Sequence, residues 1–587
     1  MSRREKLALK GFWETVEQRL AACSADALRA ILRAMAHETL PSERQAFLDQ
    51  LQPEAASAAR VQGVAGQEEL LTDIADRTEE LQAEREGAET WEERYGWDGD
   101  DEEDSLGPYA DFVEPLTALF DRTEAAFDYG DVTVARAAYH KLFDVLALED
   151  DYGRGVRAEH LPDVDVGEAR ARYLRAVYDT EALTHRPQAL FEQMTLTRSW
   201  LTQPRPMLDD VIQIYPKPLP DSEQFFPDWM AFLRTQPGSD ADAWLRESIR
   251  LSQGTQGLAA LARTEGMQHP RAYVDWCAAL EREAKHQEVL ATAQEALRTL
   301  PEQIPIRAAV ADFLCAAATL LHDMEALQAG RWEAFMAQPT LARLLDVWEA
   351  APPGLERTRQ MHQAAHHVQD VLAHPPRQQA LEAWEDDLER PAWPDTSVLA
   401  HAYLLAADWE AAHQLAADAQ VLGWSSRSHA QGLVVSCFLV RLSGRLPGAL
   451  PPNLVQLWQW GLQNSAGFGA WHRGDAGETG LLARLQRAYA ECLSMTSFLR
   501  ADAQAETLAW CLDIAQRRIN AIVSNQHRGS YDRAAVLLAA CAETLQLRGN
   551  DREAHALLDE VRQQFPRHRA FQTEVKAAVQ RMEHGLE

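Results

Sequence analysis

Apolar side chains recur at helical spacing along most of the chain, most clearly between residues 538 and 566. The pattern there predicts two amphipathic helices separated by the turn 548–551. In the first helix the apolar residues occur at i, i+3, i+4 and i+7, and they are Leu538, Cys541, Ala542 and Leu545. In the second helix the apolar face starts at Ala554, five residues after Gly549, and continues four and seven residues later. Pro566 ends this helix, because proline cannot continue a helical hydrogen-bond ladder.

The same offsets recur in five further stretches, so the chain is predicted to contain repeated helical hairpins. The small or apolar residue that opens the second helix of each is Ala135, Val289, Leu327, Ala364 or Ala412. Three of these units are closed by Pro301, Pro339 and Pro376, which follow one another at 38 and 37 residues. A regular spacing of this length is typical of stacked helical hairpins.

These hairpins resemble tetratricopeptide (TPR) repeats, in which small residues lie where two helices touch and a proline closes the unit. The resemblance extends over six units and about half of the chain. It implies a superhelical scaffold whose concave face binds a peptide or a partner protein, since each hairpin has an apolar face that only stacking can bury. Residues 517–571 are also similar to the helical tails of bacterial SWIM zinc-finger proteins. The zinc ligands of that family are missing here, so its function is not carried over.

No stretch of useful length alternates apolar and polar residues as a strand does. The sequence therefore predicts an all-α fold, a TPR-like α-solenoid of stacked helical hairpins with a small N-terminal helical module. The predicted divisions are a helical module (1–53), a charged helix with an acidic linker (54–107), a helical domain with one hairpin (108–203), a proline-rich linker (204–230), regular repeats (231–446), an irregular Trp/Gly-rich insertion (447–480) and C-terminal helical repeats (481–587).

The formal net charge of −32 argues against a general nucleic-acid binder and favours a partner protein with a basic surface. Nine acidic residues lie between Glu89 and Asp104, partly at the spacing of calcium ligands. The glycine of a calcium loop is absent and Tyr109 replaces its closing carboxylate, so we interpret the segment as an acidic linker. Docking of this segment to a basic partner is the alternative. In the helix predicted at 167–183, three arginines are expected on the outer face, namely Arg170, Arg172 and Arg175.

The seven cysteines never form a CxxC pair, and several occur in apolar helical patterns. They are predicted to be reduced, packed thiols of a cytoplasmic protein. The first residues lack the apolar core of a signal peptide, and the longest uncharged apolar run, 432–440, is about half the length of a membrane span. The abundance of alanine, leucine and arginine is typical of a bacterial protein.

Two clusters suggest chemistry without the motif that would support it. His362 and His366 lie one helical turn apart, close to His367 and His374, but no HExxH motif accompanies them. We interpret them as ordinary helix residues. The glycine-rich loop 467–480 lacks the GxxxxGK[ST] sequence of a phosphate-binding loop. Its Trp471 and Arg473 are interpreted as contacts for a partner.

One basic neighbourhood interrupts the acidic sequence, formed by Arg517, Arg518, His527, Arg528 and Arg533. Together with Ser530 and the free amides of a helix predicted to start near Tyr531, it suits an anion or a partner's carboxylate. The alternative is that these cations pair with acidic side chains of the same chain.

The sequence therefore predicts a non-enzymatic scaffold or regulatory subunit that binds another protein in a bacterial assembly, such as one of stress response or defence. It assigns no catalytic residue, cofactor or metal ligand. Two alternatives remain: an enzyme whose metal or nucleotide site is assembled from distant residues, and direct binding of anions or nucleic acid through residues 517–533. Oligomeric state, partner identity and the number of stacked repeats are left open.

Overall fold

The computed structural model describes residues 55–87, 106–149, 154–200, 204–302, 304–374, 394–424, 429–466, 477–495 and 501–584. These residues form 23 α-helices and contain no strand, which confirms the all-α fold. The predicted N-terminal module, the acidic segment 89–104 and the loop residues 467–476 lie outside this part of the chain. None of the described helices is both long and apolar enough to cross a membrane.

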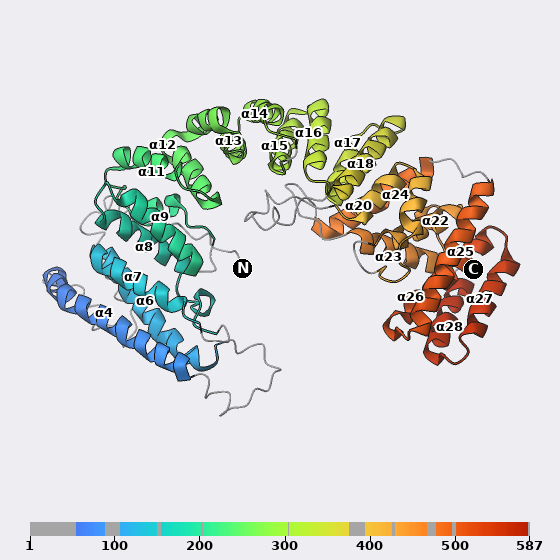
Figure 1. Cartoon of the computed structure of the whole chain (residues 1–587), viewed down its shortest axis with the longest axis horizontal. Coiled ribbons are helices and arrows are strands. Elements are labelled where there is room, and N and C mark those ends of the chain that lie inside the picture. Colours follow the sequence, from blue (N-terminus) through green and yellow to red (C-terminus); the bar gives the residue numbers. More distant parts are fainter. Residues whose placement is uncertain are drawn as a thin grey trace, which may run out of the picture. The chain divides into compact units, whose positions relative to one another are not determined.

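The chain divides into two compact units, residues 1–258 and 259–587. The first contains α4 (Ala55–Gly87), η1 (Gly107–Phe112), α6 (Val113–Asp128), α7 (Val132–Leu146), η2 (Ala158–His160), α8 (Val166–Thr180), α9 (Arg186–Trp200), α10 (Leu208–Gln213), α11 (Ser222–Leu233) and most of α12 (Ser239–Glu265). Helix α12 is interrupted at Gly254, whose φ is 63°. Helices α6, α7 and α8 pack side by side (Figure 1), and α9 packs on α8 and on α11.

The proline-rich residues 204–230 differ from the predicted linker. They form α10 and α11 and bury apolar side chains in the first unit, including Leu208, Val211 and Trp229. The three arginines of α8 also differ from expectation, because none is more than 5% exposed. Arg175 shows the reason. Its Nη2 atom donates hydrogen bonds to the carbonyls of Lys217 and Pro218 at 3.0 and 3.1 Å, so the non-helical residues 216–221, here called the strap, cover this part of α8.

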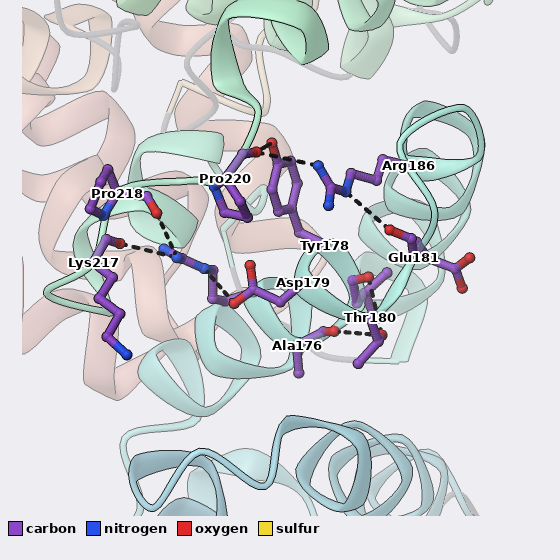
Figure 2. Close-up of polar contacts among 11 residues, drawn as sticks. Ala176, Tyr178, Asp179, Thr180, Glu181, Arg186, Lys217, Pro218 and Pro220 are labelled. Atoms are coloured by element: carbon purple, nitrogen blue, oxygen red, sulfur yellow. Dashed lines mark hydrogen bonds and ion pairs between the residues drawn. The ribbon is translucent and has the colours of Figure 1, made fainter.

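The strap carbonyl of Pro220 also accepts hydrogen bonds from side chains of α8 and α9 (Figure 2). The Tyr178 hydroxyl donates to the Pro220 carbonyl at 2.7 Å, and Nη1 of Arg186 donates to it at 3.3 Å. The Arg186 guanidinium also lies 4.6 Å from the centre of the Tyr178 ring. Three prolines in this stretch leave it few backbone donors of its own. Side chains of α8 and α9 therefore supply the hydrogen bonds that secure the strap.

The second unit contains the end of α12 and then α13 (Arg271–Arg282), α14 (His286–Thr299), α15 (Ile306–Leu321), α16 (Met324–Ala337), α17 (Leu341–Ala350), α18 (Leu355–Ala373), α20 (Thr396–Leu405), α21 (Trp409–Ala417), α22 (Ala430–Leu442), η3 (Pro447–Ala449), α23 (Pro452–Ala466), α24 (Gly477–Met495), α25 (Ala501–Ser524), η4 (Arg528–Ser530), α26 (Tyr531–Leu547), α27 (Asp551–Gln564) and α28 (Arg569–His584). Each helix from α13 to α18 packs on the next, and α18 packs on α20. Every side chain of α22 is buried, because α20, α21, α23, α25 and α26 all pack around it.

Six turns between consecutive helices share one backbone geometry. Each contains a residue with a positive φ between 55° and 90°: Gly130, Ala284, His322, Ala407, Gln526 and Gly549. The amide after this residue bonds to the carbonyl five positions earlier, as from Asn550 to Leu545 at 2.9 Å. This pattern satisfies carbonyls at the end of the first helix. The residue five positions after each turn residue is buried, which agrees with the offset seen in the sequence at Gly130 and Gly549.

Candidate functional site

The basic residues predicted between 517 and 533 do not form one continuous cationic surface. Arg517 is exposed but pairs with Asp513 at an N–O distance of 2.9 Å. Arg518 is only 6% exposed. The side chains of His527, Arg528 and Arg533 are exposed, and Arg533 lies in the first turn of α26. Of the other predicted contact residues, Trp471 and Arg473 lie outside the described part of the chain.

Arg518 and Arg533 both line a pocket in the second unit. The pocket lies where α22, α23, α25 and α26 converge, and its walls include Trp424, Trp460 and His429. Leucines from three of these helices complete the apolar part of the wall. The cavity volume is about 30 Å³, which leaves room for about one or two water molecules. The pocket therefore suits the end of a side chain.

The two guanidinium groups at this pocket have no carboxylate partner within the described residues. Nη1 of Arg518 donates to the Val421 carbonyl at 2.5 Å, and the guanidinium lies 4.2 Å from the centre of the Trp424 ring. Burial and the charge of Arg533 lower the pKa of Arg518 to about 10. The residues between Trp424 and His429 contain no acidic side chain. Two positive charges thus lie close together in a protein whose net charge is −32.

Asp532 is the carboxylate nearest to Arg533 in sequence. Its side chain is exposed on the first turn of α26, and it forms no ion pair with either arginine of the pocket. The N-cap residue Ser530 makes no side-chain hydrogen bond to the helix. The first turn of α26 therefore carries both the Arg533 guanidinium of the pocket and, at Asp532, a carboxylate next to the partial positive charge of the helix terminus.

His429 contributes a further polar atom to the pocket. It occupies the N-cap position of α22, and its Nδ1 atom is buried without a hydrogen-bond partner among the described residues. Burial and the nearby Arg518 charge lower the pKa of His429 below its usual value. The imidazole is therefore neutral at neutral pH, and its Nδ1 atom is a buried polar atom in the wall of the pocket.

Two glycines bring the walls of the pocket together. A Cβ atom at Gly461 would lie 2.3 Å from Oγ of Ser436, so only glycine lets α23 approach α22 this closely. A Cβ atom at Gly432 would lie 3.0 Å from the Trp424 ring. The glycine at 432 thus allows the indole to lie flat on α22, where it supports the Arg518 guanidinium.

A serine–histidine–tyrosine chain lies beside the pocket and bears on the enzyme alternative. His401 is fully buried; its Nε2 atom lies 3.0 Å from Oγ of Ser465, and its Nδ1 atom lies 2.8 Å from the Tyr489 hydroxyl. Burial lowers the pKa of His401 to about 3 and raises that of Tyr489 well above its usual value. A neutral phenol does not stabilise the imidazolium that base catalysis requires. We therefore interpret the hydrogen bonds among Ser465, His401 and Tyr489 as structural.

The other sequence clusters show no shared geometry. His362 lies 3.6 Å from Asp408, whereas His367 is bonded to the Met336 carbonyl at 2.9 Å. No group of three or more potential ligands in the described residues is arranged to hold a metal ion. Burial raises the pKa of the Cys277 and Cys541 thiols to about 12, so these cysteines are unreactive core residues.

Sequence reasoning singled out the two arginines of the pocket but missed Trp424, His429 and Trp460. These three residues belong to segments that are separated in sequence from α25 and α26, and each also fits an ordinary helix or turn. The available signal was weak: a tryptophan follows Gly423 shortly before a fully apolar helix. In comparisons with known proteins, no family model matches the chain and no curated protein matches it significantly.

Proposed function

We propose that the protein is a non-enzymatic scaffold that binds a partner protein at the pocket between Arg518 and Arg533. The observation that carries this proposal is the pair of uncompensated guanidinium groups beside two tryptophans. Arginine and tryptophan dominate the binding energy of protein interfaces, particularly when they surround a small, desolvated pocket. The resemblance to TPR repeats supports the same class of function, because stacked helical hairpins present extended binding surfaces.

The charge of the whole chain and the charge of the pocket act over different distances. A net charge of −32 attracts partners with a basic surface during diffusional encounter. The pocket acts only after contact, where it selects one anionic group and fixes the orientation of the partner. A basic protein that presents one acidic group within its binding face satisfies both requirements.

Direct nucleic-acid binding is less well supported by the same residues. Arg517 is paired with Asp513 and Arg518 is buried, so only His527, Arg528 and Arg533 of the predicted group are exposed without an ion pair in the described structure. Three exposed side chains in a protein of this net charge are a weak phosphate-binding surface. We expect no binding of a single-stranded or duplex oligonucleotide at low salt. Salt-sensitive binding that is lost on Arg533→Glu would favour this alternative instead.

The proposal is tested by affinity capture from the native host with the tagged full-length protein as bait. We expect a protein captured in stoichiometric amount by the wild type to be lost from Arg533→Glu. Arg528→Glu is the matched control, because Arg528 is an equally exposed neighbour that does not line the pocket. Equal loss from both variants would indicate a diffuse charge effect, and retention of the partner by Arg533→Glu would contradict the proposal.

A further inference from the structure

We infer that the pocket binds a single carboxylate group of a partner polypeptide, with Arg518 as the buried anchor and Arg533 as the second, outer cation. The inference rests on the proposed function and adds the chemistry of the ligand. It draws on the Arg518 side chain, which is more than nine-tenths buried and lacks an ion-pair partner among the described residues, and on the unpaired Nδ1 atom of His429.

The Arg518 guanidinium is already oriented for a ligand. The Val421 carbonyl accepts a hydrogen bond from Nη1, and the Trp424 ring supports one face of the planar group. No hydrogen bond from Nε or Nη2 to another described residue accompanies that contact. A guanidinium fixed in this way binds a carboxylate through parallel hydrogen bonds with little further loss of side-chain entropy.

The electrostatics of the pocket favour an anion. Burial of Arg518 opposes its charge, and the neighbouring Arg533 opposes it further. A carboxylate placed between the two arginines would cancel the repulsion from Arg533 and would offset part of the cost of burying the Arg518 charge. Binding of such a ligand is therefore expected to raise the pKa values of both Arg518 and His429.

The lining of the pocket favours a carboxylate over a phosphate. The cavity volume of about 30 Å³ corresponds to about one or two water molecules, so the inner end of the pocket accepts only a small polar group. A tetrahedral phosphate is bulkier, and the apolar and aromatic walls would leave several of its oxygens without donors. The leucine and tryptophan side chains instead suit the methylene groups that carry an acidic side chain.

The ligand class is tested with an array of short peptides on which the full-length protein is captured. Each peptide is made in four versions, with Glu, Gln or phosphoserine at one central position or with a free carboxylate at the C-terminus. We expect the Glu version to bind about tenfold more tightly than its Gln twin, since the charge-assisted hydrogen bonds are lost in the amide. Stronger binding of the free C-terminal version would also support a carboxylate and would assign it to a chain end.

Two variants assign the binding to this pocket. Arg533→Gln should abolish the preference for Glu over Gln, whereas Arg528→Gln should leave it unchanged. Both positions are exposed, so neither change is expected to impair folding, which circular dichroism and the melting temperature would verify. A preference for phosphoserine, equal binding of the Glu and Gln peptides, or a Glu preference that survives Arg533→Gln would each overturn the inference.

The result of the peptide experiment can be distinguished from the result of the capture experiment. If the host partner is lost from Arg533→Glu while the peptides show no preference for Glu, the pocket binds a partner but not through a carboxylate. If the peptides behave as expected while the captured partner is unaffected by Arg533→Glu, the carboxylate site exists but does not mediate that interaction.

Discussion

Each of the six hairpin turns depends on one residue with a positive φ. In three of the hairpins that the sequence predicted, this residue is not glycine: it is Ala284, His322 or Ala407. The spacing of five residues from the turn residue to the first buried residue of the next helix was visible in the sequence at Gly130 and Gly549, because glycine marks a turn. At Ala284, His322 and Ala407 the sequence did not show which residue forms the turn, because neither alanine nor histidine marks a left-handed conformation. The buried residue five positions later was still recognisable, since burial depends on the helical pattern and not on the turn residue.

We expect Ala407→Gly to stabilise the second unit by about 1 kcal/mol, because an L-residue at positive φ carries a strain that glycine lacks. Ala406 has an ordinary helical conformation with φ −71°, so Ala406→Gly should instead destabilise the unit. Chemical denaturation monitored on both variants measures the difference. Destabilisation by Ala407→Gly would show that strain at this turn is negligible.

A buried carboxylate in the first unit predicts a pH dependence of stability. Glu247 accepts hydrogen bonds from the amides of Leu208 and Asp209 at 2.9 Å, and burial raises its pKa from 4.5 to about 7. The folded state holds the proton more tightly than the unfolded chain. The resulting stabilisation is complete below pH 4.5 and is lost as the pH rises to about 7.

Glu247→Gln removes this titration. Between pH 4.5 and pH 7 the wild type should lose stability relative to the variant, by about 3 kcal/mol at most. The repulsion among the many acidic side chains changes equally in both proteins and cancels in the comparison. Parallel melting curves across this range would contradict the assignment.

At the scale of elements, the strap shows where sequence reasoning stops. Helix α8 was predicted, but its arginines were expected in solvent because arginine is seldom buried. The burial of Arg175 depends on carbonyls about forty residues away, such as that of Lys217, and buried Arg172 bonds to the Glu124 carboxylate at a similar separation in sequence. Nothing in the local pattern encodes these contacts. The proline-rich composition did not reveal that α10 and α11 pack into the core of the first unit.

We expect Arg186→Met to loosen the strap, because the variant loses the hydrogen bonds to the Pro220 and Glu181 carbonyls. A loss of about 1–3 kcal/mol is expected for such contacts. Lys217→Met is the control, since the strap uses the backbone carbonyl of Lys217 and the side chain is exposed. Hydrogen exchange should show faster exchange in α10 and the strap for Arg186→Met alone. Unchanged exchange in that variant would mean that the guanidinium does not hold the strap.

At the scale of the whole molecule, the sequence predicted a protein of helical hairpins and a basic neighbourhood near its end. Part of that neighbourhood lines the candidate site: Arg518 and Arg533 meet at the pocket, whereas Arg517 pairs with Asp513. The sequence could not show which of these arginines line the pocket, because this depends on how α25 and α26 pack against α22 and α23. Trp424 and His429 join the site only through that packing.

The ratio of partner captured by the Arg528→Glu and Arg533→Glu baits measures whether the partner binds at the pocket of Arg518 and Arg533. Both changes reverse one exposed charge in the same basic neighbourhood, but only Arg533 lines the pocket. We expect capture near the wild-type level with Arg528→Glu and a loss of about tenfold or more with Arg533→Glu. Equal capture by the two baits would contradict the assignment of partner binding to the pocket.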